Sequence, residues 1–149
     1  MRIAQQLYEG VDVKGMGTVG LITYLRTDSV RISEEADSSA REFIKENYGE
    51  KYLSDDAAVK KSSKKIQDAH EAIRPSDIYR VPSDIKESLS RDQFRLYQLI
   101  WKRFAASRMA KSVYETTSVK ISIGDYIFSF SASKLLFDGF ELAYVQADD

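Results

Sequence analysis

The chain has 149 residues, of which 43% are hydrophobic, so it can bury a core that serves one domain or one domain and part of a second. Its 22 basic and 23 acidic residues leave a net charge of −1, which argues against a protein that coats nucleic acid through overall positive charge. The lack of cysteine excludes disulfides, thiolate metal sites and cysteine nucleophiles, and no apolar run approaches the ~20 residues of a membrane-spanning helix.

A helix is predicted at the N-terminus, with Ile3, Leu7 and Tyr8 on one side and an end near Gly10. This helical pattern starts at once, and the apolar core of a signal peptide is not present. We therefore expect the chain to be a segment of a longer protein.

The chain between this helix and the next is predicted to be irregular. Residues 11–20 contain three glycines and indicate a loop, residues 21–25 favour a short strand, and residues 26–29 favour a turn. Ser33 is expected to cap a second helix, because a serine hydroxyl accepts a hydrogen bond from a free backbone N–H of the first turn. Gly49 is a plausible end for that helix.

Residues 54–68 are polar, contain four lysines and have almost no large apolar side chains. This composition predicts a mobile surface loop, and a phosphate-contacting patch is the alternative interpretation. After this segment, Pro75 disfavours helix at Arg74, and Pro82 is placed to open a short helix.

A long helix is predicted to begin after Ser90, where Gln93 completes a capping box. Its apolar and aromatic residues recur at helical spacing and are expected to pack in the core, with a base-stacking platform as the alternative. These residues are Phe94, Tyr97, Ile100, Trp101, Phe104 and Ala105.

The C-terminal part has the alternation of strands. Apolar and polar residues alternate over residues 118–123 and again over 126–131, and Gly124 with Asp125 forms a hairpin turn between them. A third short strand is expected over residues 134–137, followed by a turn. The predicted fold class is α+β and mainly helical: a helical domain over residues 1–112, then a partial antiparallel β-segment over residues 113–149.

The residues suited to chemistry are few. Tyr24 and Arg26 are two positions apart in an extended segment and so share one face, and His70 is the one histidine. A tyrosine hydroxyl stays protonated at neutral pH, so a nucleophilic tyrosine needs a base or a nearby cation. Tyrosine, arginine and histidine together suit phosphodiester cleavage, although a single histidine is more often structural.

Two stretches carry a family resemblance. Residues 20–29, GLITYLRTDS, resemble the active-site signature of type IA DNA topoisomerases, and residues 69–75, AHEAIRP, resemble the second signature of that family. Residues 4–10, 96–104 and 137–140 resemble the flanking helix, the following long helix and a turn of the adjoining β-domain. Leu25 stands where the type III branch usually has proline, so the chain resembles the bacterial topoisomerase I branch.

The resemblance implies a role for each residue. Tyr24 would attack single-stranded DNA and hold the 5′-phosphate, Arg26 would orient it and stabilise charge, and His70 would contact a phosphate. Arg74 is a further DNA-binding candidate, although Glu71 and Arg74 are also expected to hold the shape of their loop. The domain that carries the tyrosine would be followed by the first strands of a truncated β-domain.

The family places its magnesium site in a toprim domain, and nothing in this sequence resembles that acidic cluster. The resemblance therefore implies no cofactor in this segment, magnesium in the full-length enzyme, and a fragment that is inactive alone. The expected partners are single-stranded DNA and the missing toprim and β-domains of the same chain, in the bacterial cytoplasm and not at a membrane. The alternatives are a non-catalytic nucleic-acid or protein interaction module with this fold, and the topoisomerase part of a reverse gyrase.

Overall fold

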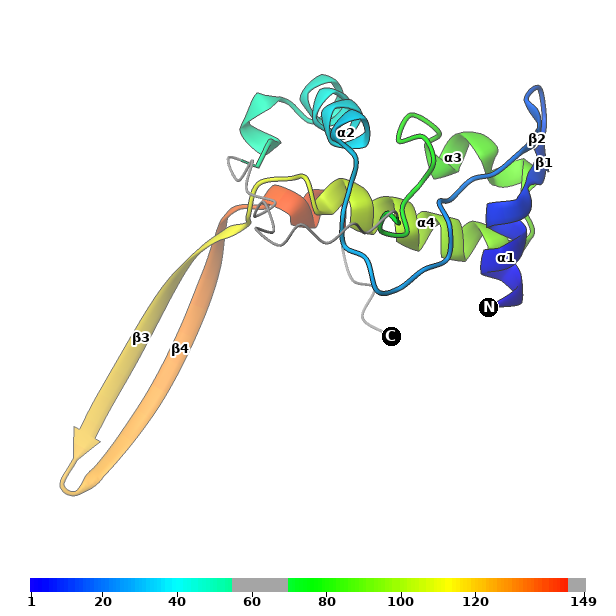
Figure 1. The fold of residues 1–149 in the computed structure, drawn as a ribbon. Helices are drawn as coiled ribbons and strands as arrows, with labels where there is room; N and C mark the ends of the chain where they lie inside the picture. Colours follow the sequence, from blue (N-terminus) through cyan, green and yellow to red (C-terminus); the bar gives the residue numbers. More distant parts are fainter. Residues whose placement is uncertain (55–69, 145–149) are drawn as a thin grey trace.

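The computed structural model describes residues 1–54 and 70–144, and it has the predicted α+β class (Figure 1). A helical part is built around the long helix α4, and a long two-stranded hairpin projects from one end of that part. The helices and strands are α1 (Arg2–Glu9), β1 (Val11–Val13), β2 (Gly17–Val19), α2 (Glu34–Asn47), α3 (Pro82–Ile85), α4 (Arg91–Ala106), β3 (Val113–Ile123) and β4 (Tyr126–Phe137). Short 3-10 turns are η1 (Glu50–Tyr52), η2 (Lys86–Ser88) and η3 (Gly139–Leu142).

The helix predictions are confirmed by the caps. Ser33 accepts a hydrogen bond from the backbone N–H of Ala36 and starts α2, and Ser90 and Gln93 form the predicted capping box of α4. The helix of residues 82–85 begins at the predicted proline, Pro82. The loop predicted over residues 54–68 lies, except for Ser54, outside the described residues. No helix in the described ranges is long and apolar enough to cross a membrane.

Two predictions for residues 11–25 are wrong. The expected loop of residues 11–20 is a small hairpin, in which Val11 pairs with Val19, and its turn uses glycines with positive φ at Gly15 and Gly17. The expected strand of residues 21–25 is only an isolated bridge between Ile22 and Pro75. The pairing does not extend into a ladder, because the Leu21 N–H donates to the Leu7 carbonyl oxygen and the Arg74 N–H donates to the Thr23 hydroxyl.

The core of the helical part is packed against α4. Tyr97 is fully buried and its hydroxyl donates to the Arg80 carbonyl oxygen at 2.7 Å, while Trp101 Nε1 donates to the Ile78 carbonyl oxygen at 2.8 Å. Each bond satisfies a buried polar group and ties the loop of residues 76–81 to the helix. This loop leads directly out of the segment that carries His70, so α4 fixes one side of the candidate site.

We expect Tyr97→Phe to lower the free energy of unfolding by about 1–1.5 kcal/mol, because it leaves the Arg80 carbonyl oxygen without its buried donor. Urea unfolding of the chain measures this. Tyr79→Phe is the control: its hydroxyl bonds to Glu46 at the surface, so its effect should stay below about 0.5 kcal/mol. Equal losses in the two variants would contradict the role given to the buried bond.

The C-terminal hairpin differs from its prediction in length. The third strand expected over residues 134–137 is wrong, because this stretch continues β4 and pairs with the start of β3, with a bulge beside Val113. The turn expected after it is the 3-10 turn η3. The two-residue turn at Gly124 and Asp125 is confirmed, and the φ of +58° at Gly124 suits a glycine.

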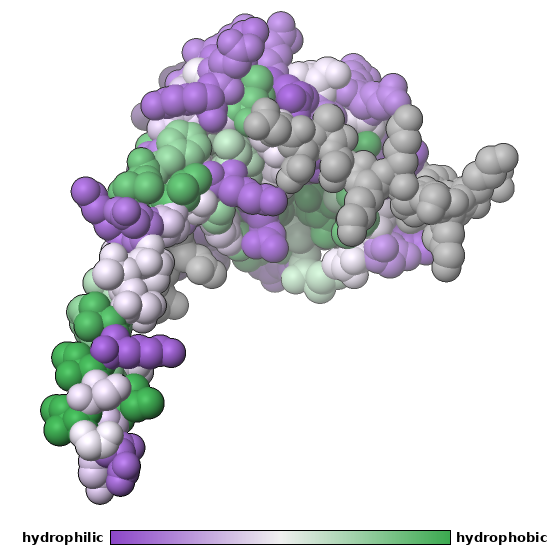
Figure 2. Space-filling model, turned by 90° about the vertical axis from the view of Figure 1, so that its left-hand side faces the viewer, coloured by the Kyte–Doolittle hydropathy of each residue, from purple (hydrophilic) through white to green (hydrophobic). Residues whose placement is uncertain are grey.

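One face of the hairpin is apolar and uncovered. Residues that face each other across the strands, such as Val119 with Phe130 and Ile121 with Phe128, put their side chains on one side, and serine and threonine pairs occupy the other. Figure 2 shows apolar groups gathered along the hairpin. The exposed apolar residues of this face are Val119, Ile121, Ile123, Tyr126, Phe128 and Phe130.

The base of the hairpin is held to the helical part by hydrogen bonds. The Tyr52 hydroxyl donates to Asp138 at 2.9 Å, and the Tyr114 hydroxyl donates to both carboxylate oxygens of Glu141 at 2.8 and 2.6 Å. Gly139 has a φ of +50°, and a Cβ there would lie 2.5 Å from the Ala110 carbonyl oxygen. Only glycine fits this approach, which keeps the junction closely packed.

Candidate active site

The site is built on the irregular segment that carries Tyr24. Its backbone is held by two neighbouring elements: the Leu21 N–H donates to the Leu7 carbonyl oxygen of α1 at 2.7 Å, and the Thr23 N–H donates to the Arg74 carbonyl oxygen at 2.9 Å. The Thr23 hydroxyl also donates to the Ala72 carbonyl oxygen at 2.8 Å. These hydrogen bonds therefore hold the backbone of the segment in place, although it is not part of a sheet.

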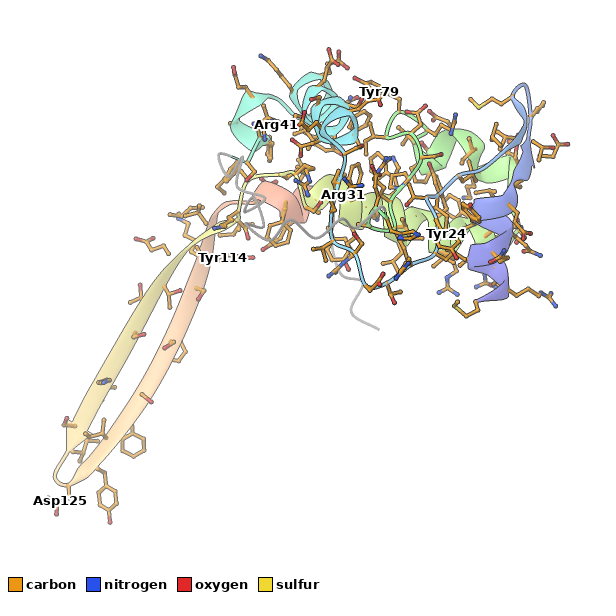
Figure 3. All side chains as sticks on the ribbon, viewed as in Figure 1. Tyr24, Arg31, Arg41, Tyr79, Tyr114 and Asp125 are labelled. Atoms are coloured by element: carbon orange, nitrogen blue, oxygen red, sulfur yellow. The ribbon has the colours of Figure 1, made fainter. Side chains whose placement is uncertain are left out.

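Tyr24 presents its ring to solvent. Its relative exposure is 54%, and its ring lies 5.5 Å from the Tyr8 ring and 5.7 Å from the His70 ring, measured between centroids. Figure 3 shows Tyr24 beside α1, far from Tyr114 and Asp125 at the two ends of the hairpin. The ring is thus accessible to a ligand, and its hydroxyl belongs to a half-exposed side chain rather than to the core.

Arg26 connects the tyrosine segment to the histidine. Its Nε donates to Asp28, at 2.8 Å from each carboxylate oxygen, and its Nη1 lies 3.1 Å from His70 Nδ1. A guanidinium group can only donate, so this contact makes Nδ1 the acceptor and leaves the ring proton on Nε2.

The backbone at His70 is joined to the turn after Arg26. The Ser29 hydroxyl, which is buried, donates to the His70 carbonyl oxygen at 2.7 Å, and the Ala72 N–H donates to the Arg31 carbonyl oxygen at 2.8 Å. The predicted convergence of Tyr24, Arg26 and His70 from separate parts of the sequence is therefore present. The three side chains lie close enough to meet one phosphate group together.

A shallow hollow of about 240 Å³ lies between the two segments and is lined by Thr23, Tyr24, His70 and Glu71. The Tyr24 and His70 rings line it, and the Arg26 guanidinium that contacts His70 adds a positive charge nearby. These groups suit an anionic ligand with a planar neighbour, such as a nucleotide phosphate with its base.

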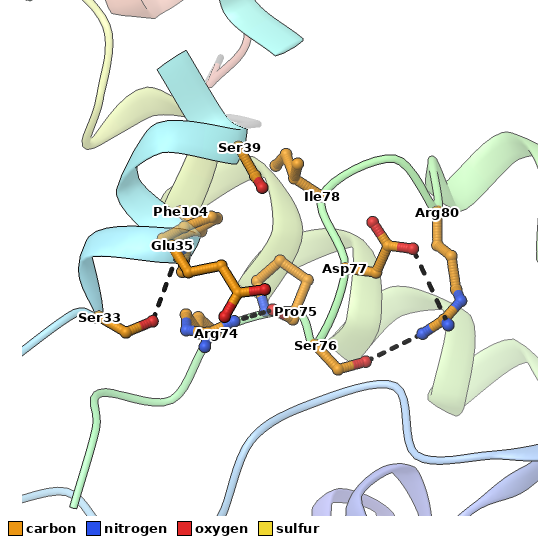
Figure 4. Close-up of a pocket in the computed structure, with 11 residues that line it drawn as sticks. Ser33, Glu35, Ser39, Arg74, Pro75, Ser76, Asp77, Ile78, Arg80 and Phe104 are labelled. Carbon is orange, nitrogen blue, oxygen red and sulfur yellow. Dashed lines mark hydrogen bonds and ion pairs between the residues drawn. The ribbon is translucent and has the colours of Figure 1, made fainter. Parts of the chain in front are cut away.

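Arg74 points elsewhere. Its Nε and Nη2 donate to Glu71 at 2.9 and 2.6 Å, and its Nη1 donates to the Pro75 carbonyl oxygen at 3.0 Å. Its side chain lines a separate cavity of about 390 Å³ beside α2, where Arg80 bonds to Ser76 and Asp77 (Figure 4). Through these contacts Arg74 holds the shape of its loop. Its role in binding DNA stays a prediction.

The Glu71 carboxylate is the partner that fixes Arg74. Burial by itself would raise its pKa, but hydrogen bonds from Arg74 and Ser33 and the charge of Arg31 together hold the pKa of Glu71 below its ordinary value. A lowered folded-state pKa means that this carboxylate stabilises the fold above its unfolded pKa of about 4.3 and that the stabilisation is lost as the pH falls through the folded value.

We therefore expect Glu71→Gln to destabilise the chain at pH 7 and to have a smaller effect as the pH falls through the folded-state pKa, because the wild-type carboxyl group then becomes protonated. Urea midpoints measured at pH 7, 5 and 3 test this. Glu42→Gln, on the exposed side of α2, serves as the control and should shift the midpoint little at any pH. A Glu71→Gln effect that is equal at pH 7 and pH 3 would contradict the charged interaction with Arg74.

The described residues do not form a site suited to magnesium. In residues 1–54 and 70–144 no three histidine, aspartate or glutamate side chains converge as metal ligands. Asp28 and Glu71, the carboxylates nearest to Tyr24 in the two site segments, are each bonded to an arginine.

Two residues at the site were not selected from the sequence as site residues. Tyr8 reads as part of the apolar side of the first helix, and Asp28 reads as a turn residue, because neither has a spacing that marks a ligand. The Tyr8 ring contacts Tyr24, and Asp28 holds Arg26 in place. The two-residue step from Arg26 to Asp28 was a usable signal, since it puts opposite charges within reach.

Comparison with known proteins shows the family of the chain. A family described as DNA topoisomerase matches residues 1–149, the whole chain. The chain is similar to the structure of full-length topoisomerase I from Thermotoga maritima, with 43% sequence identity and a TM-score of 0.81 over 96% of this chain. That match covers 22% of the Thermotoga maritima protein, so the chain spans about a fifth of its length.

Proposed function

Since this chain belongs to the DNA topoisomerase family, we propose that it is the tyrosine-bearing segment of a bacterial type IA enzyme, which cuts and rejoins one DNA strand to relax negative supercoils. The observation that carries this proposal is the convergence of Tyr24, Arg26 and His70 at one exposed hollow. The substrate is single-stranded DNA, and the enzyme acts in the bacterial cytoplasm without ATP.

Tyr24 is the nucleophile. Its phenol oxygen loses a proton and attacks a DNA phosphorus, the bond from phosphorus to the 3′ oxygen breaks, and the 3′ oxygen takes up a proton. The 5′-phosphate remains on the tyrosine, and the reverse attack by the 3′ hydroxyl restores the strand. Because one phosphodiester is exchanged for another, neither water nor an energy source is consumed. The half-exposed ring supports this role.

Arg26 and His70 bind the phosphate on which this exchange occurs. The Arg26 guanidinium has a donor left over after its contacts with Asp28 and His70, and it carries the charge that a pentavalent phosphorus needs nearby. His70, which Arg26 contacts, lies against an oxygen of the same phosphate. Asp28 keeps the guanidinium oriented, so the arginine does not have to be ordered when DNA binds.

We place the magnesium site and the groups that move the protons in a toprim domain outside this chain, which would supply electrostatic stabilisation of the phosphate. A β-domain would continue from β3 and β4, and its strands would cover the apolar hairpin face of Val119, Ile121, Ile123, Tyr126, Phe128 and Phe130. A face of this kind is otherwise a site of aggregation.

Trapping the covalent intermediate tests the proposed function. The intact enzyme is incubated with a single-stranded oligonucleotide and magnesium, denatured, and digested for mass spectrometry. We expect a nucleotide on Tyr24, joined through the 5′-phosphate of the downstream fragment, and a free 3′ hydroxyl on the upstream fragment. If binding occurs with no adduct on any tyrosine, the chain is an interaction module that has only the fold. An attached helicase domain in the intact protein would instead indicate reverse gyrase.

A further inference from the structure

The Tyr24 side chain has no hydrogen bond that holds it among the described residues; its recorded contacts are the rings of Tyr8 and His70. A tyrosine that is 54% exposed has several rotamers open to it unless its neighbours exclude them. The proposed reaction needs the phenol oxygen in one place. Whatever fixes this ring therefore contributes to the rate.

Tyr8 is held more firmly than an exposed residue at a helix end usually is. It belongs to the last turn of α1, next to Leu7, which is fully buried and accepts the backbone bond from Leu21. The Tyr8 carbonyl oxygen lies so close to Gly20 that a Cβ on Gly20 would come within 2.7 Å of it. The helix end and the tyrosine segment are thus packed backbone to backbone.

The two rings meet edge to face. Their planes are inclined by 67° with centroids 5.5 Å apart, which is the favoured geometry for an aromatic pair. This contact uses the ring of Tyr8. No hydrogen bond of the Tyr8 hydroxyl is recorded with any described residue, and the side chain is 38% exposed, so burial alone does not explain an aromatic residue here.

On this geometry, and resting on the proposed function, we propose that Tyr8 is a positioning residue that holds the Tyr24 ring in the orientation for attack on the phosphate. It acts through Tyr24 and does not touch the reacting atoms. An edge-to-face ring is required and the hydroxyl is not. Losing the ring should lower the fraction of molecules with a correctly placed nucleophile, and with it the cleavage rate, without weakening DNA binding through the phosphates.

The experiment compares Tyr8→Phe with Tyr8→Leu in the intact enzyme. Single-turnover cleavage of an end-labelled single-stranded oligonucleotide gives the rate, and anisotropy gives its Kd. We expect Tyr8→Phe to cleave within about twofold of the wild type and Tyr8→Leu to cleave about tenfold more slowly, which is the size of one lost aromatic contact. Both variants should bind within about twofold. If Tyr8→Leu does not fold, Tyr8→Met takes its place, because an unbranched side chain fills irregular space.

The outcomes separate the two levels of the proposal. If both variants cleave at the wild-type rate, the positioning role is overturned and the proposed function stays intact. If both variants lose the same amount of activity, the effect belongs to the Tyr8 hydroxyl, and the positioning role is overturned as well. A wild-type enzyme that forms no adduct would overturn the proposed function itself, and the role of Tyr8 with it.

Discussion

Tyr24→Phe in the intact enzyme is expected to remove the covalent adduct and to lower plasmid relaxation by at least about a thousandfold. The substitution deletes one oxygen, the proposed nucleophile, and keeps the ring that packs against Tyr8 and His70. Binding of a single-stranded oligonucleotide should stay within about threefold of the wild type, because contacts to phosphates dominate the affinity. Gel assays of relaxation and anisotropy measure the two effects.

Tyr79→Phe is the matched control for this experiment. It removes a hydroxyl from another half-exposed tyrosine, one that packs against Phe43 and bonds to Glu46 away from the site. It should leave relaxation within about twofold of the wild type. Full relaxation by the Tyr24→Phe enzyme would show that another group attacks the phosphate, and the proposed chemistry would fail.

The 149-residue chain by itself is expected to leave supercoiled plasmid unchanged, with or without magnesium. The described residues contain Tyr24, Arg26 and His70 but no converging carboxylates for a metal, and the carboxylates beside the site are bonded to arginines. Without a second half to stabilise the phosphate and move the protons, the tyrosine has no means to react. The intact enzyme, assayed beside it at equal concentration, is the positive control.

This second prediction separates binding from catalysis. The chain is expected to bind single-stranded oligonucleotides weakly and with a shallow salt dependence, since the site supplies few phosphate contacts. Relaxation that depends on magnesium and that disappears in the Tyr24→Phe chain would mean that residues of this chain complete the site. The assignment of the acid–base groups to another domain would then be wrong.

The elements that the sequence predicts correctly have local causes. The starts of α2 and α4 could be predicted from Ser33, Ser90 and Gln93, because a cap acts within one helical turn. The hairpin turn could be predicted from Gly124, because few residues accept a positive φ. Each of these signals is complete within a short stretch of chain.

The errors and omissions have long-range causes. Whether residues 21–25 form a strand depends on distant partners, and the Leu21 and Arg74 N–H groups that would extend the pairing donate to Leu7 and to the Thr23 hydroxyl instead. The contact between Tyr8 and Tyr24 depends on the fit of Gly20 against α1, which no local pattern encodes. His70 reaches Arg26 only through the bonds that Ser29 and Thr23 make with its loop. His70 was a candidate as the one histidine and through the resemblance to a family, and local spacing would not have linked it to Tyr24.

The closely packed base of the hairpin has a mechanical consequence. With 11 residues in β3 and a rise of about 3.3 Å per residue, the hairpin is a lever arm of roughly 36 Å. The base of the hairpin is rigid for two reasons. There is no room for a side chain at Gly139, and the carboxylates of Asp138 and Glu141 accept hydrogen bonds from tyrosines on either side of the junction. A rotation of the helical part by roughly 10° would therefore sweep the hairpin tip through about 6 Å. A small rotation of the helical part therefore becomes a larger displacement wherever the tip is attached.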